Sequence, residues 1–180
     1  GIRFSTASPS CWATQPPMAT ISEGLAALIL AMRPRKLNAF CSAFSRMVDM
    51  GAEPFLVAAS VRAVLAQRLV RKVCPSCCES HEITPSELSM LGLPKDEAFT
   101  IRRGQGCKNC TNGYRGRMGI FELLTMNEQI RSMIMERATF EQIRDYGLAH
   151  TPYTTMRSDG IEKIRQGRTT PEEIARVTLN

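Results

Sequence analysis

The sequence predicts a mixed α/β chain that is mostly helical, with a cysteine-rich module ahead of a helical C-terminal region. Three observations predict this class. Helix-capping patterns recur along the chain, two runs alternate as β-strands do, and two C-x-x-C pairs lie on either side of the first of those runs. The 180 residues are 43% hydrophobic and 22% charged, as in globular proteins, so we expect a buried core rather than disorder.

Charge and hydropathy exclude several classes of protein. The net charge of +6 allows an acidic partner but is too small to require nucleic acid. The longest nearly continuous apolar run, residues 25–32, is far shorter than the roughly 20 residues that cross a bilayer, so we expect no transmembrane segment. No basic stretch precedes this run, which argues against a secretory signal. The first residue is Gly1 rather than Met, and we expect the chain to be a fragment.

The first orderly part of the sequence predicts two helices. Residues 43–50 predict a short helix, and residues 54–72 predict a longer one. Pro54 occupies the first helical position, where proline is tolerated, and Pro75 requires the longer helix to end by Val73. The residues that recur at helical spacing on its apolar face are Val57, Val61, Val64 and Leu65.

Capping residues and alternation mark the remaining elements. Thr84 and Glu87 form a capping box that predicts a helix ending at Gly92. Residues 98–102 and 118–124 alternate as strands do. The residues expected to begin the four later helices are Asn127, Thr139, Thr155 and Thr170.

The two C-x-x-C pairs are the most specific chemical signal in the sequence. Each pair can form a tight turn that directs two thiolates to one ion, and two such turns supply the four sulfurs of a closed tetrahedral zinc site. Such a site is structural rather than catalytic. It would close the 29 residues between the pairs into a small lobe. The four predicted zinc ligands are Cys74, Cys77, Cys107 and Cys110.

Other interpretations of the seven cysteines stay open. With no secretory signal, a metal site is favoured over a disulfide framework, but the four thiols are alternatively free and buried, or include one redox pair. His81 is an alternative ligand. Cys78 directly follows a ligand and is expected to point away from the ion. We expect Cys11 and Cys41 to be ordinary buried thiols.

Several catalytic motifs are absent from the sequence. It contains no phosphate-binding G-x-x-x-x-G-K-[ST] loop, no G-x-S-x-G turn and no H-E-x-x-H pair. We therefore predict no catalytic residue in these 180 residues, and on motif grounds the chain is not a complete enzyme.

Residues 45–180 contain a series of ordered motifs that are specific in combination. The segments are residues 45–58 (SRMVDMGAEPFLVA), 65–75 (LAQRLVRKVCP), 106–110 (GCKNC), 113–123 (GYRGRMGIFEL), 156–161 (MRSDGI) and 167–173 (GRTTPEE). Together they resemble the secretion ATPases of type II secretion systems and of type IV pilus assembly.

The resemblance implies a RecA-like P-loop ATPase domain that forms a hexameric ring, located in the cytoplasm and peripheral to the inner membrane. In the full-length family member, ATP with Mg²⁺ is the cofactor. Its hydrolysis moves an inner-membrane platform protein, so that pilins or pseudopilins assemble and proteins are secreted. The resemblance also implies that the tetracysteine module binds Zn²⁺. The chain itself lacks the Walker A loop, so we expect it to be inactive alone.

The resemblance also suggests how the chain is divided. Residues 43–73 are expected to be the end of the RecA-like domain, residues 74–124 the zinc-binding module, and residues 125–180 a C-terminal helical bundle. Residues 1–42 lack the acidic and histidine boxes expected in that region. We interpret them as a disrupted segment, for example one read in a shifted frame.

Gln67 and Arg68 are the two candidate nucleotide-pocket residues. They lie on the predicted helix before the first C-x-x-C pair, where they would line a nucleotide pocket or a subunit interface. Alternatively, Arg68 and Arg71 only stabilise the C-terminal end of that helix through its dipole.

Two other function classes stay open from the sequence. A zinc ribbon could bind nucleic acid through the basic residues around the second C-x-x-C pair, but only one aromatic residue, Tyr114, lies close enough to stack on bases, so nucleic acid is not the expected partner. The basic residues around the second C-x-x-C pair are Arg102, Arg103, Lys108, Arg115 and Arg117.

In the other function class, the C-terminal helices would serve as a protein-interaction adaptor.

Overall fold

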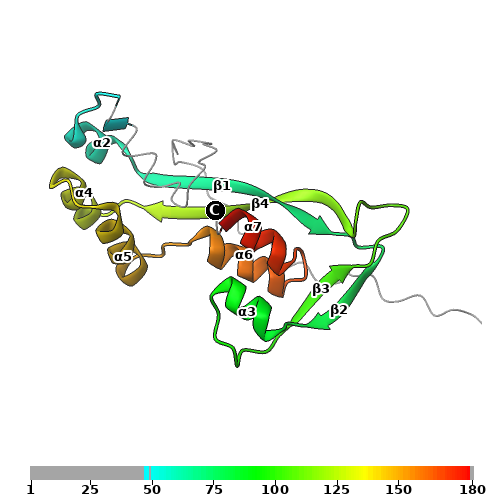
Figure 1. The fold of residues 1–180 in the computed structure, drawn as a ribbon. Helices are drawn as coiled ribbons and strands as arrows, with labels where there is room; N and C mark the ends of the chain where they lie inside the picture. Colours follow the sequence, from blue (N-terminus) through cyan, green and yellow to red (C-terminus); the bar gives the residue numbers. More distant parts are fainter. Residues whose placement is uncertain (1–46, 49, 179–180) are drawn as a thin grey trace, which may run out of the picture.

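The computed structural model of the chain describes residues 47–48 and 50–178. Its centre is a long ladder of two antiparallel strands, with helices packed at one end and along the middle, and a smaller two-stranded sheet near the other end (Figure 1). The elements are α2 (Pro54–Ser60), β1 (Ala63–Val73), β2 (Cys78–Glu82), α3 (Pro85–Leu91), β3 (Thr100–Gly104), β4 (Tyr114–Thr125), α4 (Glu128–Met135), α5 (Phe140–His150), α6 (Met156–Arg165) and α7 (Pro171–Thr178).

Strands β1 and β4 form the ladder. Ala63 pairs with Thr125 at one end and Arg71 pairs with Arg117 near the other, and an irregularity follows Arg71. Alternate residues of β1 turn toward the helices, so Val64 is buried whereas Gln67 is exposed. Both strands are long, with 11 residues in β1 and 12 in β4. The first cysteine pair follows β1 in the sequence, and the second precedes β4.

The prediction of a single helix over residues 54–72 was wrong. Helix α2 ends at Ser60, and β1 begins three residues later. Val57, Val61 and Val64 do face one core, as their helical spacing suggested, but they reach it from a helix, a helix end and a strand. The pattern was ambiguous because the backbone of residues 63–73 finds hydrogen-bond partners in β4, a strand distant in the sequence.

Most of the other predicted elements are confirmed. Thr84 caps α3 with the expected capping box, and Gly92 ends that helix in the left-handed conformation with φ of 70°. The two predicted strands correspond to β3 and β4 with shifted or extended bounds. Of the helix predicted over residues 43–50, residues 47 and 48 are helical, and the remainder lies largely outside the described residues.

Three of the later helices begin with a side-chain cap, as predicted. Asn127 caps α4, Thr139 caps α5 and Thr155 caps α6, each by accepting a hydrogen bond from a backbone N–H in the first turn. Helix α7 follows Thr170, also as predicted. The mixed helix and strand class is confirmed, although the chain has more strand than the sequence indicated.

Within residues 50–178, the buried side chains form two clusters that the ladder connects. One cluster joins the middle of the ladder to α3, α6 and α7, and its fully buried members include Val70, Ile120 and Ile174. The other joins the far end of the ladder to α2, α4 and α5 around Leu124 and Ile130. Over the described residues, every helix is too short or too polar to cross a membrane.

Packing between α6 and α7 generates a first prediction. A Cβ added at Gly160 would lie 2.8 Å from two carbon atoms of Ile174, which is fully buried. We expect Gly160→Ala to lower the free energy of unfolding by about 1–3 kcal/mol, because the crowded core must shift to admit the methyl group. Chemical denaturation measures this change.

The matched control is Glu162→Ala on the exposed face of the same helix. It should change the free energy of unfolding by less than about 0.5 kcal/mol. Equal stabilities for Gly160→Ala and the unmodified chain would show that α6 and α7 do not pack as closely as described.

Candidate metal centre and the clamp beside it

The four predicted ligand cysteines come together in one cluster. Their Sγ atoms all lie within 4.8 Å of one another. Neighbouring pairs are closer still, with Sγ–Sγ distances of 3.9 Å for Cys74–Cys107, 3.8 Å for Cys77–Cys110 and 3.7 Å for Cys107–Cys110. A tetrahedral ion with metal–sulfur bonds of about 2.3 Å separates its sulfurs by about 3.8 Å. The donor set and its spacing therefore fit a zinc ion.

Backbone structure positions these thiols. Cys74 directly follows β1, and its N–H donates to the Gly113 carbonyl oxygen at 2.8 Å. In the second pair, the Cys107 N–H points to the Cys110 Sγ at 3.2 Å, as in turns that present two thiolates to one ion. Gly113 and Gly104 approach so closely that a Cβ on either would lie about 2 Å from the carbonyl oxygen of the other. Side chains at these two positions would push the end of β3 away from the turn before β4.

The protein environment shifts the pKa values of the cysteine thiols in different directions. Burial raises the pKa of Cys77 to about 12. Burial also acts on Cys110, but N–H groups of Cys107 and Gly113 and the neighbouring thiols more than offset it and lower its pKa to about 7. Cys110 therefore favours the thiolate, the form that binds metal. The N–H of Asn109 lowers the pKa of Cys107, but burial and the neighbouring thiols outweigh it and raise that pKa.

The remaining candidate ligands lie elsewhere. Cys78 begins β2 opposite Gly104, and its Sγ lies 3.8 Å from the Pro75 carbonyl oxygen. His81 lies farther along β2, opposite Ile101, and does not join the cluster. Cys11 and Cys41 lie outside the described residues.

Gln67 and Arg68 lie on strand β1, so the helix predicted to carry them was wrong. They alternate across the strand, with Gln67 exposed and Arg68 partly buried. The Arg68 guanidinium donates to the Val177 carbonyl oxygen and lines a cavity of about 300 Å³ beside Glu122 and Tyr153. Burial raises the pKa of Glu122, although the Tyr153 hydroxyl donates to it at 2.8 Å. Neither Gln67 nor Arg68 belongs to the cysteine cluster.

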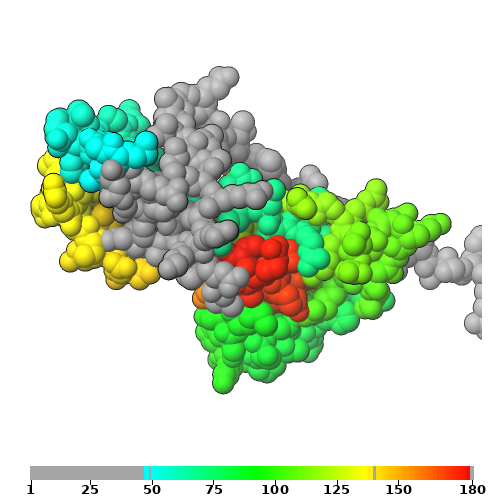
Figure 2. Space-filling view, turned by 45° about the horizontal axis from the view of Figure 1, so that its top comes forward, coloured from blue at the N-terminus to red at the C-terminus, as the bar shows by residue number. Residues whose placement is uncertain are grey.

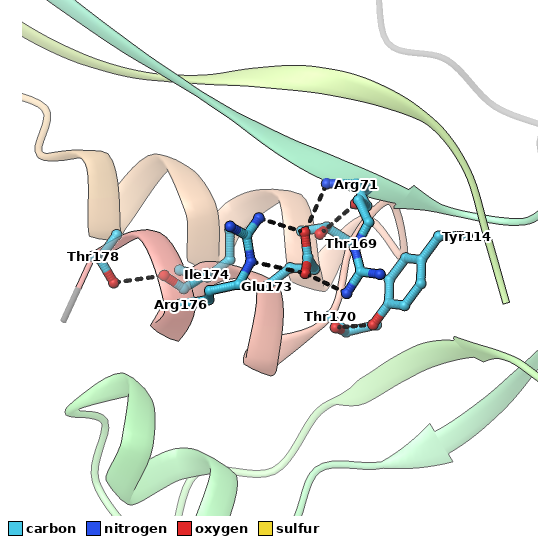
Figure 3. Close-up of polar contacts among 8 residues, drawn as sticks. All are labelled: Arg71, Tyr114, Thr169, Thr170, Glu173, Ile174, Arg176 and Thr178. Carbon is cyan, nitrogen blue, oxygen red and sulfur yellow. Dashed lines mark hydrogen bonds and ion pairs between the residues drawn. The ribbon is translucent and has the colours of Figure 1, made fainter. Parts of the chain in front are cut away.

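A buried carboxylate fastens α7 to the end of β1 next to the cluster (Figure 3). Glu173 is 1% exposed and accepts hydrogen bonds from the Arg71 N–H at 2.9 Å and the Arg71 guanidinium at 2.7 Å. The Arg176 guanidinium donates to the same carboxylate at 3.0 and 3.2 Å. We call these three residues the Glu173 clamp. The two cations neutralise a charge whose burial would otherwise be costly.

Further contacts extend the Glu173 clamp toward the cysteines. The Arg71 guanidinium lies 4.1 Å from the centre of the Tyr114 ring, and the Tyr114 and Thr170 hydroxyls are 2.9 Å apart. Thr169 donates to the Arg71 carbonyl oxygen at 2.9 Å, and the Val73 N–H donates to the carbonyl oxygen of Arg168 at 3.0 Å. The turn before α7 is thus tied to the last residues of β1.

Sequence reasoning missed this clamp. In the sequence, Glu173 is recognisable only as the last residue of the segment GRTTPEE. The one available signal was an acidic pair in that motif, GRTTPEE, with no indication of its partner 102 residues earlier. Figure 2 shows α7 (red) lying directly against α3 (green), and α7 also contacts β1.

Comparisons with known proteins agree with the motifs. Residues 36–176 match the family described as Type II/IV secretion system protein. Over 142 residues, the chain is 41% identical to the type II secretion system protein E of Pseudomonas aeruginosa, covering 78% of this chain and 28% of that protein. It is 40% identical over 150 residues to the type II secretion system ATPase E of Vibrio cholerae, covering 83% and 29% respectively.

The similarity extends to pilus assembly. The chain is 33% identical over 151 residues to the type IV pilus assembly ATPase PilB of Pseudomonas aeruginosa, covering 83% of this chain and 26% of that protein. The chain spans less than a third of the length of each of these curated relatives.

The Glu173 clamp predicts a pH-dependent stability. Burial alone would raise the pKa of Glu173, but the bonds from Arg176 and Arg71 outweigh it and lower the pKa from 4.5 to about 2. The ionised clamp therefore stabilises the fold above pH 4.5, and this contribution is lost as the pH falls toward 2. We expect Glu173→Gln to cost about 2–3 kcal/mol at pH 7 and to flatten the fall in stability below pH 4.5.

Urea denaturation between pH 3 and 7 measures both effects. Glu172→Gln is the control, since Glu172 is 45% exposed and pairs with Arg103 at the surface. Its cost should stay below about 1 kcal/mol. Parallel pH profiles for the unmodified chain and Glu173→Gln would contradict the clamp.

Proposed function

The chain belongs to the type II/IV secretion system protein family, and from this membership we propose that it supplies the metal-bearing body of a secretion or pilus-assembly ATPase. The observation that carries the proposal is the tetrahedral spacing of four sulfurs within a chain of this family. In the whole protein, ATP with Mg²⁺ would bind to a RecA-like domain in a hexameric ring. That ring would act on an inner-membrane platform protein from the cytoplasmic side.

The proposed role of the metal is structural. With four sulfur ligands a zinc ion has no open position for substrate, so Cys74, Cys77, Cys107 and Cys110 would hold it without joining the chemistry. When bound, it would join the end of β1 to the loop before β4. It would close residues 74–113, the segment that contains both cysteine pairs, which we call the cysteine lobe. This closure would suppress local opening of the lobe.

The Glu173 clamp supports a mechanical role for the same body. It binds α7 to β1 immediately before Cys74, and the ion pairs of Arg103 with Glu87 and Glu172 bind α7 to α3 and β3. The lobe, the ladder and the last helix are thus joined by charged and backbone contacts on several sides. A domain movement in the ring would then displace the lobe as a unit. We propose Gln67 and Arg68 as interface or pocket residues on the ladder rather than as catalytic groups.

The contacts of the lobe weigh against nucleic-acid binding. Arg103 is paired with Glu87 and Glu172. Tyr114, the aromatic residue nearest the second cysteine pair, has Arg71 over its ring and its hydroxyl bound to Thr170. Base stacking on this ring would require the Glu173 clamp to open.

Metal analysis tests the proposed centre. We expect one zinc ion per chain by elemental mass spectrometry, and we expect Cys74→Ser and Cys107→Ser to lose it because three sulfurs do not close the tetrahedron. Cys78→Ser is the matched control, since Cys78 lies outside the cluster and the variant should keep the ion. A folded chain that binds no zinc under reducing conditions would contradict the centre.

A segment exchange tests the secretion function. Residues 47–178 would replace the matching segment of the Pseudomonas aeruginosa protein E, which is 41% identical. We expect the chimera to restore secretion in a strain that lacks its own protein, and Cys107→Ser in the chimera to reduce secretion at least tenfold. The Cys78→Ser chimera is the control. A stable, zinc-containing chimera without secretion would refute the proposed function while leaving the metal centre intact.

A further inference from the structure

The turn after the second cysteine pair contains Asn112 followed by Gly113, the one asparagine–glycine pair in the sequence. Asn112 has a φ of 50° and Gly113 a φ of 80°. The backbones of Thr111 and Tyr114 exchange two hydrogen bonds of 3.0 Å across these two residues. In such a two-residue hairpin turn both central residues need positive φ, and asparagine followed by glycine is strongly preferred there.

Packing adds a second reason for glycine at position 113. A Cβ there would lie 2.2 Å from the Gly104 carbonyl oxygen, so the fold requires glycine directly after Asn112. The Asn112 side chain is exposed to solvent. Asparagine is a chemically labile residue, and it is most labile before glycine, because no Cβ shields the glycine nitrogen from the asparagine side chain. The fold therefore demands a pair that is prone to deamidation.

The backbone of this turn also supports two of the metal-binding cysteines. The Gly113 carbonyl oxygen accepts a hydrogen bond from the Cys74 N–H at 2.8 Å, and the Gly113 N–H donates to the Cys110 sulfur. The nitrogen that would attack Asn112 is thus held by a predicted ligand. Attack requires this N–H to leave the sulfur and lose its proton, so it occurs when the turn opens. An ion that fixes Cys110 would suppress the opening.

We propose that Asn112 is a deamidation site that the bound metal protects, and that its conversion to isoaspartate after metal loss weakens rebinding of the ion. The inference rests on the proposed metal centre. Isoaspartate carries the backbone through its side-chain carbons and makes the turn one atom longer. The close contact with Gly104 does not admit the extra atom, so Gly113 must shift. Cys74 and Cys110 would then each lose a hydrogen bond to Gly113.

The reaction needs water and no other reagent. The Gly113 nitrogen attacks the Asn112 Cγ, a C–N bond forms, and the Cγ–Nδ2 bond breaks. Ammonia leaves with the proton of the former Gly113 N–H, and a five-membered succinimide remains. Water then adds to one of its two carbonyl carbons and restores the glycine N–H. Opening at Cγ gives aspartate, and opening at the backbone carbonyl carbon gives isoaspartate.

Peptide mapping of aged samples measures the reaction. One sample is zinc-loaded, a second is stripped by a chelator and kept reduced, and both are held at mildly alkaline pH and digested with trypsin. Cleavage after Lys108 and Arg115 gives a peptide that contains Asn109 and Asn112, which fragment ions distinguish. We expect Asn112 to deamidate at least about tenfold faster in the metal-free sample, because the ion no longer holds the turn closed.

Two asparagines that do not precede glycine serve as internal controls. Asn109 lies in the same peptide and precedes Cys110, whereas Asn127 caps α4 and precedes Glu128. Both should stay largely intact in the two samples. Equal deamidation of Asn112 with and without zinc would overturn the inference.

Zinc titration of the aged metal-free chain measures the consequence. After removal of the chelator, the fraction with isoaspartate at position 112 should bind zinc at least about tenfold more weakly than the fresh chain, because it lacks hydrogen bonds that support the ligands. Asn112→Gly is the matched control, since glycine fits the positive φ and cannot deamidate. This variant should bind zinc equally before and after ageing.

Two results of the titration would contradict the inference. One is full zinc affinity in chains that carry isoaspartate at position 112. The other is an equal loss of zinc binding on ageing of Asn112→Gly, since that loss could not arise at this site.

Failure of the metal centre gives a different result. If the fresh chain binds no zinc under reducing conditions, the centre and the protection by metal are both refuted. In that chain, faster deamidation at Asn112 than at Asn109 would still support the modification site, and equal rates would refute it.

Discussion

The pairing of β1 with β4 is the constraint on which the rest of the structure depends. Both strands run beyond the helical core and end beside a C-x-x-C pair, so the register of the ladder sets where the four sulfurs lie. A shift of one residue would exchange the faces of β1 and turn Val70 out of the core. The same shift would move Cys74 away from Cys107. The hydrophobic core and the cysteine cluster therefore specify the same register.

The buried charge of Glu173 adds a second constraint of a different kind. Hydrophobic contact alone would allow α7 to slide on the sheet, whereas a carboxylate bound by Arg71 and Arg176 has one position in which its hydrogen bonds are satisfied. The Arg71 N–H is one of those donors, so the carboxylate also occupies a backbone site on the outer edge of β1. Helix α7 thus both covers the core and protects a strand edge.

The sequence was most informative where the signal was local. Thr84 and Gly92 bounded α3 because a cap and a left-handed glycine act within a single turn. The cysteine pairs were identified because metal ligands impose their own spacing. Helix and strand could not be separated over residues 63–73, since Val57, Val61 and Val64 fit a helical face and the partner strand lies 41 residues or more downstream.

The clamp and the cavity beside Arg68 were beyond sequence reasoning for a related reason. Arg71 and Glu173 are 102 residues apart, and nothing in the sequence near either residue indicates the other. Arg68 looked like a helix-end cation, whereas in the structure it faces Val177 at the opposite end of the chain. Both contacts depend on how α7 packs against β1, and the pattern of residues in the sequence did not determine that packing.

The length of the ladder has a geometric consequence. At about 3.3 Å per residue, the 11 residues of β1 make an arm of about 36 Å between the α2–α4–α5 core and the cysteine lobe. If that core rotated by about 5° and the arm stayed straight, the cysteine lobe at the far end of the arm would be displaced by about 3 Å. The amplification depends on how little the arm bends, and the arm is only two strands wide. Stiffness at its far end would come from α6, α7 and the four sulfurs.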